Sequence, residues 1–343
     1  MTALTDRLGI SFPIFGFSHC RDVVIAISKA GGLGVLGTNR LAPEQLEVEL
    51  AQIEAGIGSR PYGVDLLFPA SYVGDEPEEL AKLIPEANRQ FVVDLMTRLG
   101  VPLRPSGARD VHLSDEVNNG VITHRKARQR IEVALGHSPR LFVSALGPAP
   151  PDLINRIHER GALVAGMAGS PKHAQRHALA GEDVVIAIGA EAGGHTSSIS
   201  TMVLVPQVVD AVAPIPVLAG GGIATGRQLA GALALGAQGA WMGSAWLTSP
   251  ESDEPPVIKE MLMAARSEDA VVSRCRTGKP VRQLNTAFVQ AWEEPGAPPA
   301  LQMPLQGMLV SDALAAMIFE RPARPARRAS RTGHRPDQRV ALG

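Results

Sequence analysis

DVVIAIGAEAGGH (residues 183–195) and IPVLAGGGIATGRQLAGALALGAQGAWMGS (residues 215–244) carry the clearest structural signal in this chain. Each segment contains a short run of apolar residues that ends abruptly at glycine. The runs are continuous rather than alternating, which is typical of strands buried on both faces of a parallel sheet. A helical pattern over residues 225–235 separates two apolar runs. The second segment therefore predicts a strand–helix–strand unit.

The same alternation extends over most of the chain. Eight apolar runs predict strands, and helical patterns lie between many of them. The runs cover residues 12–17, 32–37, 61–68, 140–147, 162–169, 183–190, 215–222 and 239–244. Eight such units in a chain of this length predict an α/β fold, the closed (β/α)8 or TIM barrel. A doubly wound open sheet is the competing prediction, because periodicity alone does not separate the two.

Three further regions flank or interrupt the predicted barrel, which covers residues 1–250. Residues 69–139 are too many for a βα loop, so we predict that they hold the third barrel helix and an insertion over the barrel mouth. Residues 251–318 predict a helical C-terminal appendage near the same face. Residues 319–343 combine seven arginines with two acidic residues and lack an apolar period. That composition predicts a disordered basic tail.

Composition and charge narrow the functional class. Of the 343 residues, 45% are hydrophobic and 20% are charged, and the formal net charge is −1. The tail has a net charge of +5, so the rest of the chain has a net charge of −6. This mildly acidic body gives no indication of nucleic-acid binding. Cys20 and Cys275 are too few for a disulfide framework or a zinc site. The first ten residues do not form a secretory signal, and the long apolar region 211–246 is interrupted by glycines. We predict a cytoplasmic protein with no membrane or nucleic-acid partner.

Glycines at two predicted strand ends indicate an anion site. Gly220, Gly221 and Gly222 follow the seventh strand, and Gly243 and Ser244 close the eighth. Glycine lets backbone N–H groups approach an anion closely, and a helix N-terminus supplies further donors. In TIM barrels these two loops commonly bind phosphate. Close helix–strand packing is the alternative use of such glycines, but two such loops on one rim favour phosphate binding. The loops lack the lysine of a P-loop ATPase.

His195 follows the sixth predicted strand and so belongs to the same rim. Gly193 and Gly194 would let a flat ligand lie against the backbone beside it. Since imidazole titrates near neutral pH, His195 is a candidate general base. For Glu191, orienting the loop, binding a ribityl hydroxyl and lying on the surface all remain open. No second histidine stands at metal-ligand spacing, so we predict no metal site.

These motifs carry a family resemblance. GAEAGGH (189–195), followed by LVPQVVDAVAPIPVLAGGGIATGRQLAGALALGAQGAWMGSAW (204–246), resembles the nitronate monooxygenase family, formerly called 2-nitropropane dioxygenases. The related FMN-dependent enoyl-ACP reductases share the motif pair. The resemblance is strong over about 183–247, fair at SKAGGLGVLG (28–37) and weak through 69–139. It implies a TIM barrel that holds FMN without a covalent link.

The resemblance also implies roles for individual residues. Gly221, Gly222, Gly243 and Ser244 would hold the FMN phosphate, and Gly193 and Gly194 would lie beside the flavin ring. His195 matches the catalytic histidine of the family. The complete set of cofactor-binding residues expected on this basis is Gly16, Phe17, Gly189, Gly193, Gly194, Gly220, Gly221, Gly222, Gly243 and Ser244.

Three departures from the family pattern leave the substrate open. His19 stands where a methionine near the flavin is common, Ile188 replaces a frequent polar residue, and the neighbourhood of Met167 lacks a usual flavin contact. The leading hypothesis is an FMN-dependent enzyme that oxidises alkyl nitronates, or nitroalkanes, with O2 to a carbonyl compound and nitrite. The second is an FMN-dependent NAD(P)H reductase of enoyl thioesters.

A third hypothesis is a phosphate-binding barrel without redox chemistry. It ranks last because Lys172 and Lys279 are poorly placed to form a Schiff base. The partners expected are therefore a small-molecule substrate and either O2 or NAD(P)H. The sequence leaves a homo-oligomer open.

Overall fold

A computed structural model of the chain describes residues 2–67, 77–102 and 124–319. Eight parallel strands form a closed barrel in the order β1-β2-β3-β4-β5-β6-β8-β9, and β9 pairs with β1. Their bounds are β1 Ile14–Ser18, β2 Leu33–Gly37, β3 Tyr62–Leu67, β4 Leu141–Ala145, β5 Leu163–Ala168, β6 Val184–Ile188, β8 Val217–Gly220 and β9 Gly239–Met242. The predicted TIM barrel is confirmed, and the open sheet is excluded by the β1–β9 pairing.

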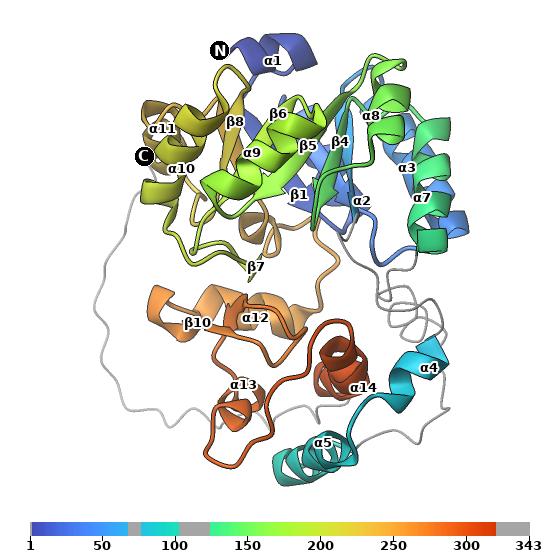
Figure 1. Cartoon of the computed structure of the whole chain (residues 1–343), viewed down its shortest axis with the longest axis vertical. Coiled ribbons are helices and arrows are strands. Elements are labelled where there is room, and N and C mark those ends of the chain that lie inside the picture. Colours follow the sequence, from blue (N-terminus) through green and yellow to red (C-terminus); the bar gives the residue numbers. More distant parts are fainter. Residues whose placement is uncertain (1, 68–76, 103–123, 320–343) are drawn as a thin grey trace, which may run out of the picture.

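Helices surround the barrel, as Figure 1 shows. They are α2 Arg21–Lys29, α3 Pro43–Ile57, α7 His124–Gly136, α8 Pro151–His158, α9 Pro171–Ala180, α10 Thr201–Val212 and α11 Gly226–Ala234. Local sequence explains where several begin. Proline occupies the first turn of α3, α8 and α9, where its missing N–H costs no hydrogen bond. The hydroxyls of Ser170 and Thr225 cap α9 and α11.

The barrel has an apolar interior and an apolar outer layer. Because successive side chains of a strand point to opposite faces, alternate residues fill the interior and the others meet the helices. The interior cluster contains Phe15, Leu33, Val35, Leu141, Val143, Leu163, Ala165, Val184, Ile186, Leu218 and Trp241. Leu4 and Leu8 of helix α1 (Ala3–Leu8) join this cluster. Helix α1 therefore closes the end of the barrel from which the strands start.

A second lobe lies on the side of the barrel opposite α1 (Figure 1). It contains α4 Pro77–Lys82, α5 Glu86–Leu99, α12 Pro256–Ala264, α13 Ala287–Trp292 and α14 Leu305–Phe319. Val92 and Met96 of α5 belong to one buried cluster with Phe288 of α13 and Val310 of α14. Segments from two distant parts of the chain therefore share one core. We name this part of the molecule the second lobe.

The second lobe departs from the helical appendage expected from sequence. Strands β10 (Ala270–Ser273) and β11 (Val281–Leu284) pair antiparallel, and β11 also pairs with β7 (Gly194–His195). The sequence predicted the helices of this region but not these strands, because strands of two and four residues leave no usable periodicity. Two short 3-10 turns, η1 (Ser244–Trp246) and η2 (Ser267–Asp269), complete the elements.

The insertion divides into two parts. Helix α7 packs against α3 and β3 and is the third barrel helix, whereas α4 and α5 belong to the second lobe. The polar middle of the insertion and the basic tail predicted over 319–343 lie outside the described residues, apart from Phe319 at the end of α14.

Candidate functional site

The loops that follow β6, β8 and β9 meet at the end of the barrel facing the second lobe. A Cβ atom added to Gly193 would collide with the hydroxyl of Ser244. A Cβ on Gly221 would lie 2.8 Å from Thr201 Oγ1 and 3.2 Å from the backbone nitrogen of Ala192. The structure thus places residues from all three loops side by side, as the barrel geometry predicts.

Backbone conformation explains the glycines of these loops. Gly194, Gly221 and Gly222 have φ angles of 83°, 116° and 69°, a region that favours glycine. Gln228, in the first turn of α11, donates from Nε2 to the carbonyl of Gly222 at 2.6 Å. The N-terminus of α11 and the glycine turn are therefore held as one unit, which is the arrangement that binds phosphate in many proteins.

Glu191 fastens the loop after β6 to helix α10. Its Oε2 accepts hydrogen bonds from the backbone N–H of Thr201 at 2.8 Å and from the Thr201 hydroxyl at 2.7 Å. Desolvation alone would raise the pKa of Glu191, but these two bonds, the backbone N–H of Glu191 and the charge of Arg282 together outweigh it and lower the pKa. A carboxylate at the start of a helix also interacts favourably with the helix dipole. Glu191 thus has the loop-orienting contact that the sequence left as one of three alternatives.

His195 lies in β7, with its side chain exposed at the rim. Its Nε2 is 2.9 Å from the hydroxyl oxygen of Thr277, a residue of the second lobe. Desolvation by the surrounding protein lowers the pKa of His195, and the positive charges of Lys279 and Arg276 lower it further. The imidazole is therefore neutral at neutral pH, which is the form that can accept a proton.

His19 follows β1 and reaches the same end of the barrel. Its Nδ1 lies 3.0 Å from the carbonyl oxygen of Gly37, so Nδ1 carries the proton and donates. Burial, reinforced by the charge of Arg40, lowers the pKa of His19 to about 4. Phe17 packs edge-on against this ring at 5.1 Å and lies 5.7 Å from the ring of Trp241. His19 is thus a neutral side chain next to the aromatic rings of Phe17 and Trp241.

Asp65 is a site residue that the sequence analysis missed. It lies in β3, pairs in register with Gly37 and Val143, and is 7% exposed. No hydrogen-bond partner exists for its Oδ1 among the described residues. Burial raises the pKa of Asp65 to about 8. The visible signal was a single acidic residue inside the apolar run YGVDLL.

Arg276 and Thr277 were also missed, because they belong to the distant segment between β10 and β11. Arg276 lies close enough to lower the pKa of both His19 and His195. The rim of the barrel thus combines two neutral histidines with nearby positive charge. Such an environment favours an anionic ligand.

The remaining predicted cofactor residues lie in or beside this end of the barrel. A side chain on Gly16 would face Ile27 and Trp246, and one on Gly189 would meet Thr201, so packing against neighbours already requires glycine at both positions. Gly220 packs against Ile188 inside the barrel. Gly243 faces the Phe17 ring, with a Cβ position 3.7 Å from Phe17 Cδ1.

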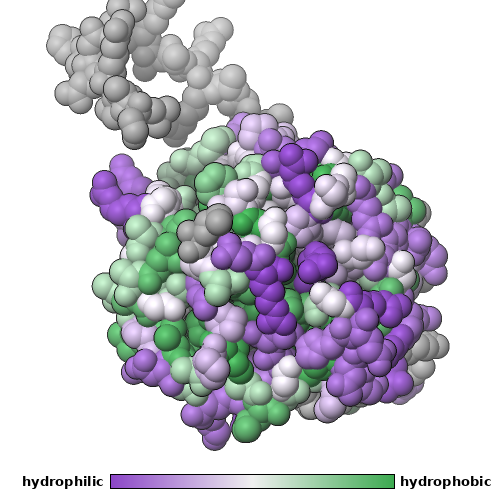
Figure 2. Space-filling view, turned by 90° about the horizontal axis from the view of Figure 1, so that it is seen from above, coloured by the Kyte–Doolittle hydropathy of each residue, from purple (hydrophilic) through white to green (hydrophobic). Residues whose placement is uncertain are grey.

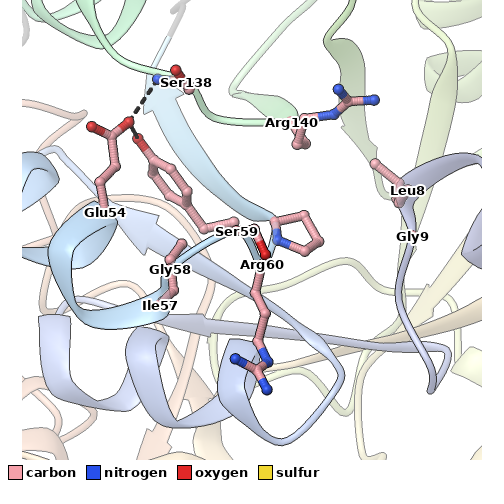
Figure 3. Close-up of a pocket in the computed structure, with 11 residues that line it drawn as sticks. Leu8, Gly9, Glu54, Ile57, Gly58, Ser59, Arg60, Ser138 and Arg140 are labelled. Atoms are coloured by element: carbon pink, nitrogen blue, oxygen red, sulfur yellow. Dashed lines mark hydrogen bonds between the residues drawn. The ribbon is translucent and has the colours of Figure 1, made fainter.

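A cavity of about 520 Å³ lies elsewhere. It is lined by residues 57–62, which lead into β3, by Ser138 and Arg140, which lead into β4, and by Leu8 and Gly9. At its edge Glu54 accepts hydrogen bonds from the Tyr62 hydroxyl at 2.9 Å and from the backbone N–H of Ser138 at 2.7 Å. Figure 3 shows how Glu54 and Ser138 lie. The surface at this end of the molecule mixes hydrophilic and hydrophobic residues (Figure 2). Since TIM-barrel chemistry occurs at the opposite strand ends, we do not assign this cavity to the active site.

The described residues contain neither a metal-binding cluster nor a membrane-spanning helix. Within residues 2–67, 77–102 and 124–319, no group of three or more His, Cys, Asp or Glu side chains could hold a metal ion. No helix in the same residues is long and apolar enough to cross a membrane.

Comparison with known proteins places the chain in a family. The sequence model described as nitronate monooxygenase matches residues 2–323. A Mycobacterium tuberculosis protein, Rv1533, named for a monooxygenase activity, is 51% identical over 321 residues, which cover 91% of this chain and 83% of the relative. The crystal structure of nitroalkane oxidase from Streptomyces ansochromogenes superimposes with a TM-score of 0.74 at 28% identity, covering 92% of this chain and 88% of that one.

A relative with a different activity is also similar. The (3aS,4S,5R,7aS)-5-hydroxy-7a-methyl-1-oxo-octahydro-1H-indene-4-carboxyl-CoA dehydrogenase of Mycobacterium tuberculosis is 31% identical over 298 residues, covering 85% of this chain and 68% of the relative. Both relatives and the family are named for oxidation–reduction chemistry, which removes the non-redox barrel from consideration. The glycine loops, the histidine of β7 and the match over residues 2–323 lead to one conclusion: the chain is an oxidoreductase of the nitronate monooxygenase family.

Proposed function

We propose that the protein is an FMN-dependent nitronate monooxygenase, which oxidises alkyl nitronates with O2 to a carbonyl compound and nitrite. The observation that carries this proposal is the convergence of the glycine loops after β6, β8 and β9 beside His195. FMN, when bound, would take electrons from the substrate and pass them to oxygen. The protein would supply binding, orientation and proton transfer.

The residues at the rim fit FMN. The glycine turn at the start of α11, together with Gly243 and Ser244, would hold the phosphate. Gly193 and Gly194 would leave room for the ring. Asp65 supports this fit independently, because a buried carboxyl group whose Oδ1 has no hydrogen-bond partner among the described residues suits the polar edge of a bound ring.

His195 would act on the substrate. A nitronate is already an anion, so it needs charge stabilisation but no deprotonation. A neutral nitroalkane must first lose a proton from carbon, and a neutral imidazole is able to accept it. The lowered pKa of His195 keeps the ring in that form at neutral pH.

Replacing His195 by asparagine tests this role. The variant should retain FMN, yet turn over neutral nitroalkanes about 10²–10⁴-fold more slowly. Turnover of preformed nitronates should fall much less. His173→Asn, at an exposed position of α9, serves as the control and should match the wild type. Equal losses on both substrates would contradict base catalysis, and full activity on nitroalkanes would make His19 the next candidate.

The cofactor is tested separately. Flavin released by heat and identified by chromatography should be FMN and not FAD, because the two glycine loops form a single-phosphate site. Recovery of FAD, or no flavin after incubation with excess FMN, would contradict the assignment.

A second candidate function is NAD(P)H-dependent reduction of an enoyl thioester. Two observations favour it: the similarity to a dehydrogenase named for a CoA substrate, and a rim near which Arg40 and Arg276 place positive charge. Anaerobic reduction distinguishes the candidates. Bleaching of bound FMN by a nitronate supports the first function, and bleaching by NADH or NADPH alone supports the second.

A further inference from the structure

The turn between β10 and β11 crosses from the second lobe to His195. Three contacts join it to the loop after β6. The backbone of Val281 pairs with His195, the N–H of Thr196 donates to the carbonyl of Pro280 at 3.3 Å, and Thr277 Oγ1 lies 2.9 Å from His195 Nε2. Within the described residues, the contact with Thr277 is the side-chain hydrogen bond that orients the ring.

The turn is itself held in place from the side of α14. The side-chain amide of Gln306, fully buried, donates to the carbonyl of Cys275 at 2.6 Å. Gly278 has a φ of 84°, and a Cβ there would collide with the carbonyl of Leu301. Its N–H donates to the carbonyl of Arg274 at 2.9 Å. The position of the Thr277 hydroxyl is therefore determined by several independent contacts.

The contacts of Thr277 leave its hydroxyl oxygen able to accept a hydrogen bond from the His195 ring. Thr277 Oγ1 already accepts a weak bond from the N–H of Lys279 at 3.3 Å, and a second lone pair remains to accept from His195. Within the described residues, no hydrogen-bond partner is found for Nδ1 of His195. If Nε2–H donates to Thr277, Nδ1 keeps its lone pair, and this bond persists when Nδ1 takes up a proton.

We propose that Thr277 is a positioning residue for His195, which accepts a hydrogen bond from Nε2–H and thereby leaves Nδ1 as the proton-accepting atom. The catalytic consequence rests on the proposed function of His195. The protonation pattern of the ring does not, because it concerns only the contact between His195 and Thr277.

Nuclear magnetic resonance of 15N-histidine-labelled FMN-bound protein tests the proposal directly. The His195 signals are assigned by their loss in His195→Asn. In the wild type, the nitrogen shifts should show a protonated Nε2 and an unprotonated Nδ1. Thr277→Ser should keep this pattern, whereas Thr277→Val should give a mixture of both tautomers and a lower pKa, because an acceptor that stabilises the imidazolium is removed.

Thr196→Val is the matched control, since Thr196 adjoins His195 but its hydroxyl donates to the carbonyl of Gly189 at 2.8 Å. It should leave the His195 signals unchanged. On neutral nitroalkanes we expect Thr277→Val to lower kcat/KM about 10–100-fold, with recovery in Thr277→Ser.

The outcomes separate the two claims. A protonated Nδ1 in the wild type, or identical tautomers and pKa in Thr277→Val, would overturn the positioning role; the wild-type measurement does so even if the valine variant fails to fold. The predicted tautomer together with full activity of His195→Asn would instead overturn the proposed role of His195 as the base and leave the contact established.

Discussion

Replacing Asp65 by asparagine should stabilise the flavin-free protein by an amount that grows with pH. In the unfolded chain an aspartate ionises near pH 4, whereas burial raises the pKa of Asp65 in the folded protein to about 8. Between these values the folded state holds a proton that the unfolded state has released. Stability therefore falls as pH rises, by about 1.4 kcal/mol per pH unit.

The full effect of this proton would reach about 5 kcal/mol at pH 8, and roughly 4 kcal/mol at pH 7, relative to pH 4. Asparagine has nearly the same shape and does not ionise in either state. The difference in unfolding free energy between Asp65→Asn and the wild type should thus increase by about 4 kcal/mol from pH 5 to pH 8. This dependence of stability on pH has the opposite sign to that of an aspartate in an ion pair, which gains stability as pH rises.

Urea unfolding at pH 5, 6, 7 and 8 measures this difference, and comparing variants at each pH cancels the titration of all other groups. Asp210→Asn, at an exposed position of α10, is the control and should show no trend. A difference that stays constant across the four pH values would refute the reasoning and mean that Asp65 is charged when folded.

Two further predictions concern the rim. Gly221→Val should weaken FMN binding, measured by fluorescence titration, because the side chain would press on Thr201 and force a φ of 116° on a β-branched residue. Gly231→Ala, in the middle of α11, is the control, because a Cβ there meets no atom within 4 Å, and it should leave binding unchanged. Equal affinities of Gly221→Val and the wild type would contradict the assignment of the loop. Arg276→Gln should raise the pKa of both His19 and His195, because a nearby positive charge is removed, whereas Lys279→Gln should raise the pKa of His195 alone. Histidine NMR titrations measure these pKa values. An unchanged pKa of His195 in both variants would show that the two charges do not act on the ring.

Sequence predicted the barrel well because continuous apolar runs such as VVIAI, ended by glycine, have few structural alternatives. The proximity of Gly193, Gly221 and Ser244 was also predictable, because the loops that follow parallel strands lie at one end of the barrel. The contact between His195 and Thr277 had no comparable signal, because the two residues are 82 positions apart and are joined by strands too short to show a period. In the sequence, Lys279 stands out only as a poorly placed candidate for a Schiff base. Its charge lowers the pKa of His195 because the pairing of β7 with β11 brings the two residues together.

The pairing of β7 with β11 also has a consequence for synthesis of the chain. All eight barrel strands have left the ribosome by the time residue 242 has emerged, whereas the partner of His195 begins at Val281 and the support from α14 begins at Leu305. Domains tend to fold as soon as they are complete during translation. A nascent chain halted near residue 260 would thus hold a barrel whose His195 loop is still without its partner strand. The candidate site is in this sense the last part of the fold that the growing polypeptide completes.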